Sequence, residues 1–178
     1  MAPRRLFALD QNFPEPIVGM LDQFLECATL VPVRSIDERM PRLEDWELLQ
    51  AIHGHEREWD GLVTSDDSML NDPRAMATLK RTGLTLVIAH GQGHNPVRAT
   101  GLLLFHLDHI CVHTVRHRPQ IWILRASQKD PEPPDKHLEK IAQREKTTVD
   151  ELLAKYAALL APPATDAGAG ASKDRTDD

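Results

Sequence analysis

The 178-residue sequence has few aromatic side chains and no excess of positive charge. It holds three Trp, one Tyr and four Phe, so the core must depend on Leu, Ile and Val, and broad platforms for base stacking are not expected. The net charge of −6 argues against a protein that coats nucleic acid through bulk charge. It remains compatible with an enzyme that meets nucleic acid at one acidic, metal-filled site.

Cysteine and long apolar runs are also scarce. Cys27 and Cys111 lie in apolar helical patterns without metal-ligand spacing, so no disulfide framework is indicated and a reduced cytoplasmic setting is expected. The apolar run that follows Arg4-Arg5 ends at Asp10 and is too short for a signal core. No apolar stretch approaches the roughly 20 residues that span a bilayer, so no membrane partner is expected.

Short apolar runs alternate with helical patterns through most of the chain. Five strands alternating with four helices predict an α/β fold, in which a five-stranded parallel sheet of common order 2-1-3-4-5 carries helices on both faces. The predicted strands are Leu6–Leu9, Leu30–Ile36, Gly61–Thr64, Leu84–Ala89 and Gln120–Leu124. The predicted helices are Pro14–Ala28, Leu43–His53 with Gly54 as its stop, Ser68–Arg81 and Pro96–Val115.

The composition changes after Arg125. Asp130–Pro134 is predicted to be a stiff linker, and residues 135–160 form a helical pair whose second member begins with a Thr148–Glu151 capping box. From Pro162 the chain is rich in Ala, Gly and Asp and is predicted to be disordered. The sequence therefore divides into an α/β domain at 1–128, a linker and helical extension at 129–161, and a tail at 162–178.

Acidic residues follow the first and third predicted strands. Asp10 ends the first strand, and Asp66 and Asp67 follow the third. In the expected order these strands are neighbours about 4.8 Å apart, at the point where the strand order reverses. Clustered carboxylates repel unless a cation lies between them, which favours a magnesium or manganese site. The alternative is that Asp66, Asp67 or Ser68 caps the next helix.

A third acid is expected to face the same region. On a helical wheel of Leu43–Ile52, Asp45 falls close to the middle of the apolar arc, while Glu44 and Glu47 lie on its flank. A carboxylate that points into an apolar seam is costly unless it is paired or binds a metal. The alternative is that Asp45 only favours the dipole of the first helical turn.

Three segments resemble one family in order and spacing. The segment Leu9-Asp10-Gln11-Asn12-Phe13-Pro14 resembles the Leu-Asp-Glu-Asn-hydrophobe-Pro opening of small bacterial PIN-like domains, which are relatives of VapC-type toxin ribonucleases. Leu43–Leu49 is similar to the acid-led second helix of that family. Leu62–Asp67 resembles its hydrophobe-hydrophobe-Thr-x-Asp signature. The resemblance covers about Leu6 to Arg125.

The resemblance implies a PIN-like endoribonuclease that holds one or two Mg²⁺ or Mn²⁺ ions. Matched position by position, it implies that Asp10, Asp45 and Asp66 are catalytic metal ligands, that Asp67 is a further candidate ligand, and that Thr64 orients a carboxylate or water. RNA is the implied substrate, and an antitoxin protein and a second copy of the chain are the other candidate partners. The chain departs from the family pattern in having Gln11 for Glu, Ser68 for a second Asp, and His90 for an acid.

Histidines at positions 106, 109, 113 and 117 form a stripe along the fourth predicted helix and just past its end. Pairs four residues apart can share a transition metal, but a polar helix face is the favoured interpretation, with contact to RNA phosphates as an added role. Two catalytic rivals fit less well. A receiver domain would need a lysine where Arg125 stands, and a haloacid-dehalogenase-type phosphatase would need an acid at Asn12. The remaining rival is a non-catalytic PIN-like module that binds RNA or protein.

Overall fold

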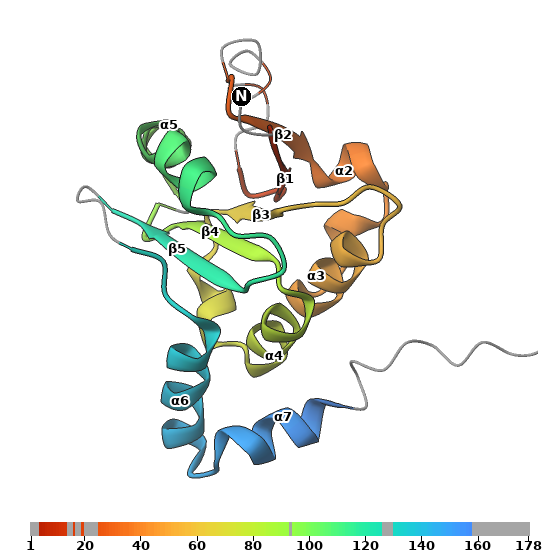
Figure 1. Cartoon of the computed structure of the whole chain (residues 1–178), viewed down its shortest axis with the longest axis vertical. Helices are drawn as coiled ribbons and strands as arrows, with labels where there is room; N and C mark the ends of the chain where they lie inside the picture. The colour runs from red at the N-terminus through yellow and green to blue at the C-terminus, as the bar shows by residue number, and fades with distance from the viewer. Residues whose placement is uncertain are drawn as a thin grey trace, which may run out of the picture.

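In a computed structural model the chain forms a wholly parallel five-stranded sheet with helices packed on its faces (Figure 1). The structure describes residues 4–13, 16, 19, 25–92, 94–125 and 130–157. The strand order is β2-β1-β3-β4-β5, so the predicted fold class and strand order are confirmed. The strands are β1 (Arg5–Leu9), β2 (Ala28–Pro32), β3 (Gly61–Thr64), β4 (Thr85–Ala89) and β5 (Gln120–Leu124).

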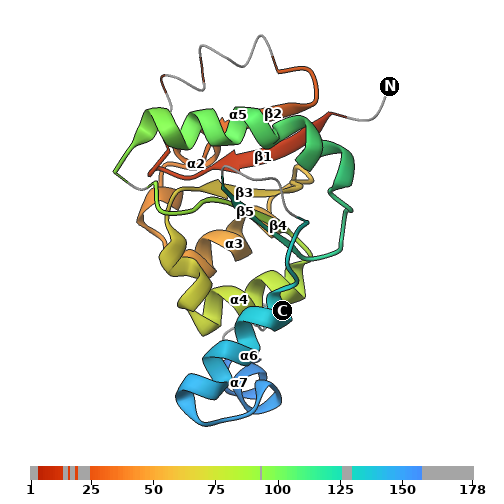
Figure 2. The same ribbon diagram turned by 90° about the vertical axis from the view of Figure 1, so that its left-hand side faces the viewer.

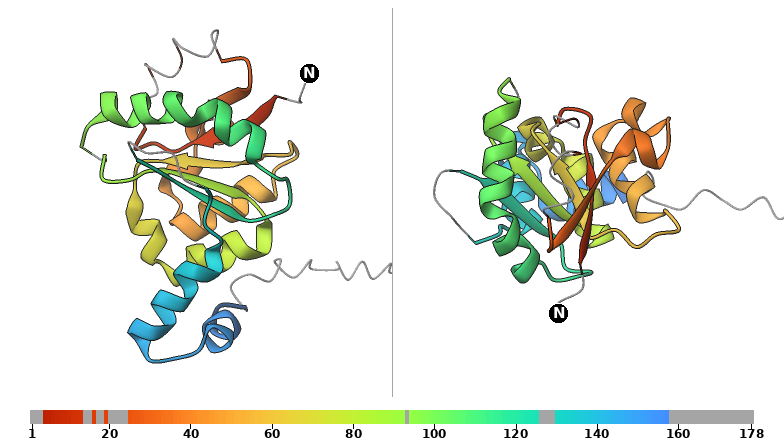
Figure 3. Two further views of the ribbon diagram at one scale, coloured as in Figure 1. Left: turned by 60° about the vertical axis from the view of Figure 1, so that its left-hand side comes forward. Right: turned by 90° about the horizontal axis from the view of Figure 1, so that it is seen from above.

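The helices lie on both sides of this sheet. Figures 2 and 3 show α5 across one face, α3 and α4 against the other, and α6 and α7 beyond α4. The α-helices are α2 (Val33–Ile36), α3 (Asp45–His53), α4 (Pro73–Thr82), α5 (Pro96–His113), α6 (Pro134–Glu145) and α7 (Val149–Ala157). Two 3₁₀ helices, η2 (Met40–Arg42) and η3 (Asp67–Asn71), precede α3 and α4. Among the described helices, none combines the length and the apolar character that a bilayer crossing requires.

The alternation of side chains along each strand divides the core into two layers. Phe7, Leu9 and Val63 pack beneath α5, whereas Ala8 and Leu62 belong to the cluster on the α3 and α4 side. Because successive side chains of a strand point to opposite faces, Asp10 and Thr64 continue the second set. The expected direction of both side chains is therefore toward α3.

Three predicted boundaries are wrong. Residues 25–28 are not helical, and Ala28 already begins β2; most of the predicted helix before them lies outside the described residues, as does the predicted tail. The strand expected to reach Ile36 ends at Pro32, because its partner β1 ends at Leu9, and the chain turns into α2. The single helix expected from Ser68 to Arg81 is broken before Pro73. There Asp72 is extended, as residues before proline prefer, and its carboxylate accepts a hydrogen bond from Arg74 N over 2.9 Å.

The C-terminal helices pack into the core of the sheet domain. Leu138, Ile141 and Ala142 of α6 and Leu152 of α7 are buried in the same cluster as α4. The predicted capping box is present, with Thr148 Oγ1 accepting from Glu151 N (3.2 Å) and Glu151 Oε2 accepting from Thr148 N (3.0 Å).

The segment expected to be a free linker is tied to the sheet. Ile121 N donates to Glu132 O (2.8 Å), and Glu132 N donates to Ile121 O (2.7 Å), so one antiparallel bridge joins the linker to β5. Local composition does not reveal this bridge, because it depends on a partner eleven residues away in a different element.

Candidate acidic site

Asp10 lies at the carboxyl end of β1 and is buried. Its backbone N–H donates to Val63 O over 2.9 Å, which extends the pairing of β1 and β3 by one residue. Three groups donate to its carboxylate: Thr64 Oγ1 to Oδ2 (2.7 Å), Gln11 N to Oδ1 (2.7 Å) and Asn12 Nδ2 to Oδ2 (3.2 Å). Burial raises the pKa of Asp10, these three donors oppose the rise, and the charge of Asp66 adds to it. The net pKa is above the ordinary value for Asp.

Thr64 connects the ends of the two central strands. Its side chain is fully buried, and its hydroxyl donates to Asp10 Oδ2 while accepting from Asp66 N over 3.0 Å. One hydroxyl therefore fixes both the carboxylate after β1 and the backbone after β3. This contact follows from the register, which pairs Leu9 with Val63 and leaves Asp10 beside Thr64.

Asp66 fulfils the capping alternative and still belongs to the acidic group. It is the N-cap of η3, and its Oδ1 accepts from Ser68 N over 2.8 Å. Its charge also raises the pKa of both Asp10 and Asp45. The two roles are compatible, because an ionised carboxylate has about four lone-pair positions and the cap occupies one.

Asp45 is the first residue of α3 and is half-buried. Burial, followed by the charges of Asp66, Asp10 and Asp72, raises the pKa of its carboxyl to about 6. Within the described part of the chain, no hydrogen bond reaches this carboxylate. The helix is capped instead by Glu44 and Glu47, so Asp45 is not needed to start it.

Asp72 is a fourth acid that the sequence analysis missed. It caps α4 and lies 3.4 Å from Arg74 Nε, and it contributes to the raised pKa of Asp45. Arg74 also pairs with Glu44 at 2.6 Å, so this guanidinium offsets the acidic group only in part. An Asp-Pro pair at the start of a helix was the signal that could have placed Asp72 near the others.

Asp67 is directed elsewhere. Its Oδ2 lies 2.9 Å from His90 Nδ1, although the imidazole is not oriented for a hydrogen bond. Asp67 lines two adjoining cavities. One, of about 370 Å³, also contacts Asn12 and Asp66, and the other, of about 360 Å³, also contacts His90 and α6. The structure thus brings Asp10, Asp45 and Asp66 into one electrostatic group and places Asp67 at its border.

The chemistry of this group fits a hard divalent cation better than a transition metal. All of its candidate ligands are carboxylate oxygens, which suit Mg²⁺ and Mn²⁺. Within the described residues, no three His, Cys, Asp or Glu side chains are close enough to form a complete cage. Mg²⁺ commonly keeps several waters and binds through only one or two carboxylates, so Asp10 and Asp66 or Asp45 would be sufficient to hold it.

The histidines of the predicted stripe have separate surroundings. His106 is buried, with Nε2 2.7 Å from Arg125 O. His109 stacks on His113 with ring centroids 4.1 Å apart and meets the edge of Trp122 at 5.5 Å. His117 lies 3.4 Å from Glu58. His113 and His117 are exposed, as the polar-face interpretation expects, whereas the buried His106 and the contact of His109 with Trp122 depart from it.

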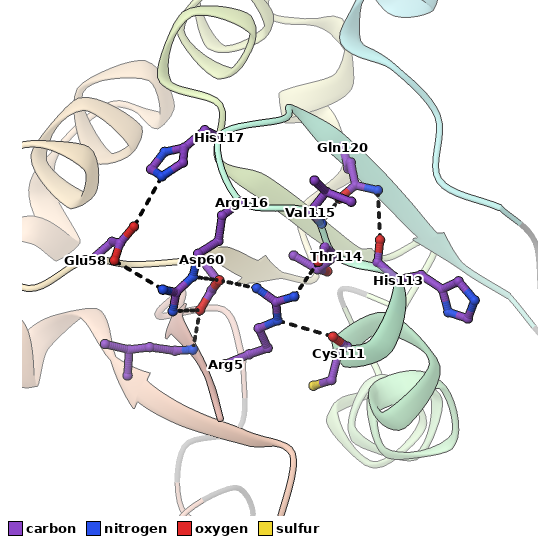
Figure 4. Close-up of polar contacts among 11 residues, drawn as sticks. Arg5, Glu58, Asp60, Cys111, His113, Thr114, Val115, Arg116, His117 and Gln120 are labelled. Atoms are coloured by element: carbon purple, nitrogen blue, oxygen red, sulfur yellow. Dashed lines mark hydrogen bonds and ion pairs between the residues drawn. The ribbon is translucent and has the colours of Figure 1, made fainter. Parts of the chain in front are cut away.

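A second polar cluster, also missed from sequence, lies at the amino ends of the strands (Figure 4). The buried Asp60 carboxylate accepts from Arg5 Nη1 (2.9 Å), Arg116 Nε (2.9 Å) and Leu6 N (2.8 Å). Burial alone would raise the pKa of Asp60, but these donors and the charge of Arg116 bring it below the ordinary value. A charged residue directly before the buried strand β3 was the available signal, because burial requires such a residue to be paired. This cluster joins β1, the residue before β3 and the segment after α5, and so it stabilises the fold.

No protein-family model, no curated protein and no solved structure matches this chain. The PIN-like resemblance therefore remains a prediction, and the function is argued from the residues themselves.

Proposed function

We propose that the chain is a divalent-metal-dependent endoribonuclease of the PIN-like type, with Asp10, Asp45 and Asp66 as its catalytic acids. One observation carries the proposal. Three carboxylates from three separate segments share one electrostatic environment at the carboxyl ends of β1 and β3, and burial together with the charges of Asp66 and Asp10 raises the pKa of Asp45 to about 6. Strand-order reversals of this kind are where open parallel sheets bind ligands.

The acids differ in ways that suit different tasks. Asp10 is held by three donors, so its geometry is fixed and it suits a metal ligand. Asp45 has no such donor and a pKa of about 6, so near neutral pH it can accept a proton from an attacking water, as a general base should. Mg²⁺ or Mn²⁺, when bound, would lower the pKa of water and stabilise charge on the phosphate.

The second candidate is a catalytically inactive PIN-like module that binds RNA or protein. It is favoured by the engagement of Asp66 as a helix cap and by the lack, within the described residues, of a complete three-ligand group. A role as the toxin of a toxin–antitoxin pair would require the active form.

The proposal is tested by incubating the purified protein with labelled single-stranded RNA in MnCl₂ or in EDTA. We expect manganese-dependent cleavage by the wild type and a loss of about 100-fold or more in Asp10→Asn and Asp45→Asn. The double variant His109→Gln with His113→Gln is the control and should cleave normally. Cleavage that persists in both aspartate variants would overturn the proposal, whereas RNA binding without cleavage would favour the inactive module.

A further inference from the structure

A cavity of about 360 Å³ lies between the sheet domain and α6, next to the acidic site. Its walls come from η3, from the ends of β4 and β5, and from α6. Three cationic side chains line it: Arg125 after β5, and Lys140 and Arg144 of α6. The lining is therefore built jointly by the sheet domain and the C-terminal extension.

Within the part of the chain that the structure describes, none of these three cations forms an ion pair with a carboxylate. Arg144 Nη2 donates to a backbone carbonyl, Asn71 O, over 3.2 Å. For Arg125 and Lys140, no ion pair is formed with any acid that the structure describes. By contrast, Lys136 of α6 pairs with Glu132, and Lys80 of α4 pairs with Asp135 of α6.

The same lining holds two acids, Asp67 and Glu132, against the three cations. Asp67 lies against His90 at 2.9 Å. Glu132 is 2.6 Å from Lys136 and 3.1 Å from His137, and Lys136 and His137 hold its pKa below the ordinary value. The cavity therefore carries a local excess of positive charge in a protein whose net charge is −6.

The position of the cavity indicates what it binds. Asp67 lines both this cavity and the neighbouring one that contains Asn12 and Asp66, so the two adjoin along the carboxyl edge of the sheet. We propose that Arg125, Lys140 and Arg144 bind a backbone phosphate of the RNA strand beside the one that is cleaved at the acidic site. This inference rests on the proposed function, since it assigns a substrate contact to the same site.

The residue types suit that ligand. Arginine offers a planar fork of donors that matches phosphate oxygens, and lysine adds a compact charge. An acidic metal site repels the rest of a polyanionic strand, so a separate cationic contact is needed to keep the strand in place. Because two of the three cations belong to α6, the C-terminal extension becomes part of the substrate site.

The test measures RNA binding apart from catalysis. A fluorescein-labelled single-stranded RNA is titrated with the full chain in EDTA, at salt concentrations from about 50 to 200 mM. The double variant Lys140→Gln with Arg144→Gln, which removes two positive charges, is compared with Arg118→Gln, which removes one from an exposed loop at the other end of β5. We expect the double variant to bind roughly tenfold more weakly and its salt slope to fall by about 0.7 for each lost phosphate contact.

The outcomes separate this inference from the proposed function. Unchanged affinity in the double variant, or an equal loss in Arg118→Gln, would overturn the phosphate site even if the RNA is cleaved. Tighter binding of poly-glutamate than of RNA, lost in the same double variant, would overturn it in favour of an acidic protein partner. Weakened binding in the double variant but not in Asp10→Asn would support the phosphate site even if no cleavage is seen.

Discussion

The hydroxyl of Thr64 lies 2.7 Å from Asp10 Oδ2 and donates a hydrogen bond to it. The hydroxyl oxygen, Thr64 Oγ1, also accepts a hydrogen bond from the backbone N–H of Asp66. A buried side chain without charge thus sets the spacing between its own segment, which holds Asp66, and Asp10, which lies 54 residues before Thr64. The position of the acids consequently depends on strand register as much as on the acids themselves.

Replacing Thr64 with valine should therefore destabilise the chain. The substitution keeps the shape but removes a donor to Asp10 and leaves Asp66 N without its acceptor, so we expect a loss of about 1–3 kcal/mol in the free energy of unfolding. Urea unfolding at neutral pH without metal measures this. Thr64→Ser, which keeps the hydroxyl, should lose less, and an equal loss in both variants would assign the effect to packing.

The two roles of Asp66 can be separated by a pair of substitutions. Asp66→Asn removes the charge but retains an oxygen for Ser68 N, so metal-free stability should not fall, because repulsion of Asp10 and Asp45 is relieved. Asp66→Ala also removes the cap and should cost about 1 kcal/mol relative to Asp66→Asn. Both variants should lose RNA cleavage. Retained cleavage in either one would leave Asp66 with only its capping role.

The raised pKa of Asp45 predicts a specific pH dependence. In the folded chain its pKa is about 6, against an ordinary value of 3.8, so between these values the folded state holds a proton that the unfolded state has released. The contribution of Asp45 to stability therefore falls as pH rises from about 4 to 6. Asp45→Asn should remove this loss and be more stable than wild type at pH 7, by roughly 1–2 kcal/mol after allowing for solvent screening.

The same comparison at about pH 3, below the ordinary pKa of 3.8, serves as its control. Asp45 is then largely protonated in both states, so the advantage of Asp45→Asn should nearly disappear. Asp10, whose pKa is also raised, changes stability in the same direction in both proteins, and the part of that change that comes from its repulsion of Asp45 belongs to the difference between them. An advantage that does not vary with pH would contradict the raised pKa.

Asp60 should be the most sensitive polar position in the fold. Its side chain is fully buried between Arg5 and Arg116, and removal of one member of a buried ion pair typically costs about 3–5 kcal/mol. We expect Asp60→Ala to lose that much at pH 7 in thermal or urea unfolding. Because the pKa of Asp60 is lowered by its donors, the stabilisation is present above about pH 4 and is lost as pH falls through its folded pKa. A loss below 1 kcal/mol would indicate that the cluster is not important for stability.

The helical extension should stabilise the whole chain. Leu138 of α6 is fully buried, so Leu138→Ala should cost about 2–5 kcal/mol, whereas the exposed Glu139→Ala should change stability by less than about 0.5 kcal/mol. A chain that ends at residue 161 should melt like the full chain, and one that ends at residue 134 should melt lower. Equal melting temperatures for the two truncated chains would contradict the packing of α6.

Much of the fold could be predicted because its signals are local. Short apolar runs such as Gly61–Thr64 identify buried strands without help from distant residues, and β3 has those bounds. Predicted boundaries were wrong where a partner strand decides them: β2 ends at Pro32 because Pro32 pairs with Leu9, the last residue of β1, and Val33 has no partner there. Pro73 could have been read as a helix start, since it lacks an N–H and its predecessor is a good cap.

For the candidate site, the sequence predicted which acids lie together better than it predicted which side chains contact them. The convergence of Asp10 and Asp66 follows from strand order, which the alternation of elements indicates. The addition of Asp72, the pairing of Asp67 with His90 and the cationic wall from α6 depend on side-chain positions between elements distant in sequence. No local pattern contains that information.

The bridge between Ile121 and Glu132 has a consequence for association between chains. β5 is an outer strand of the sheet, and outer strands offer unpaired backbone groups to other molecules. Glu132 satisfies both backbone groups of Ile121, so the segment before α6 acts as edge protection that denies a neighbouring chain a continuous row of hydrogen bonds. The extension thereby protects the sheet from intermolecular strand pairing as well as completing its core.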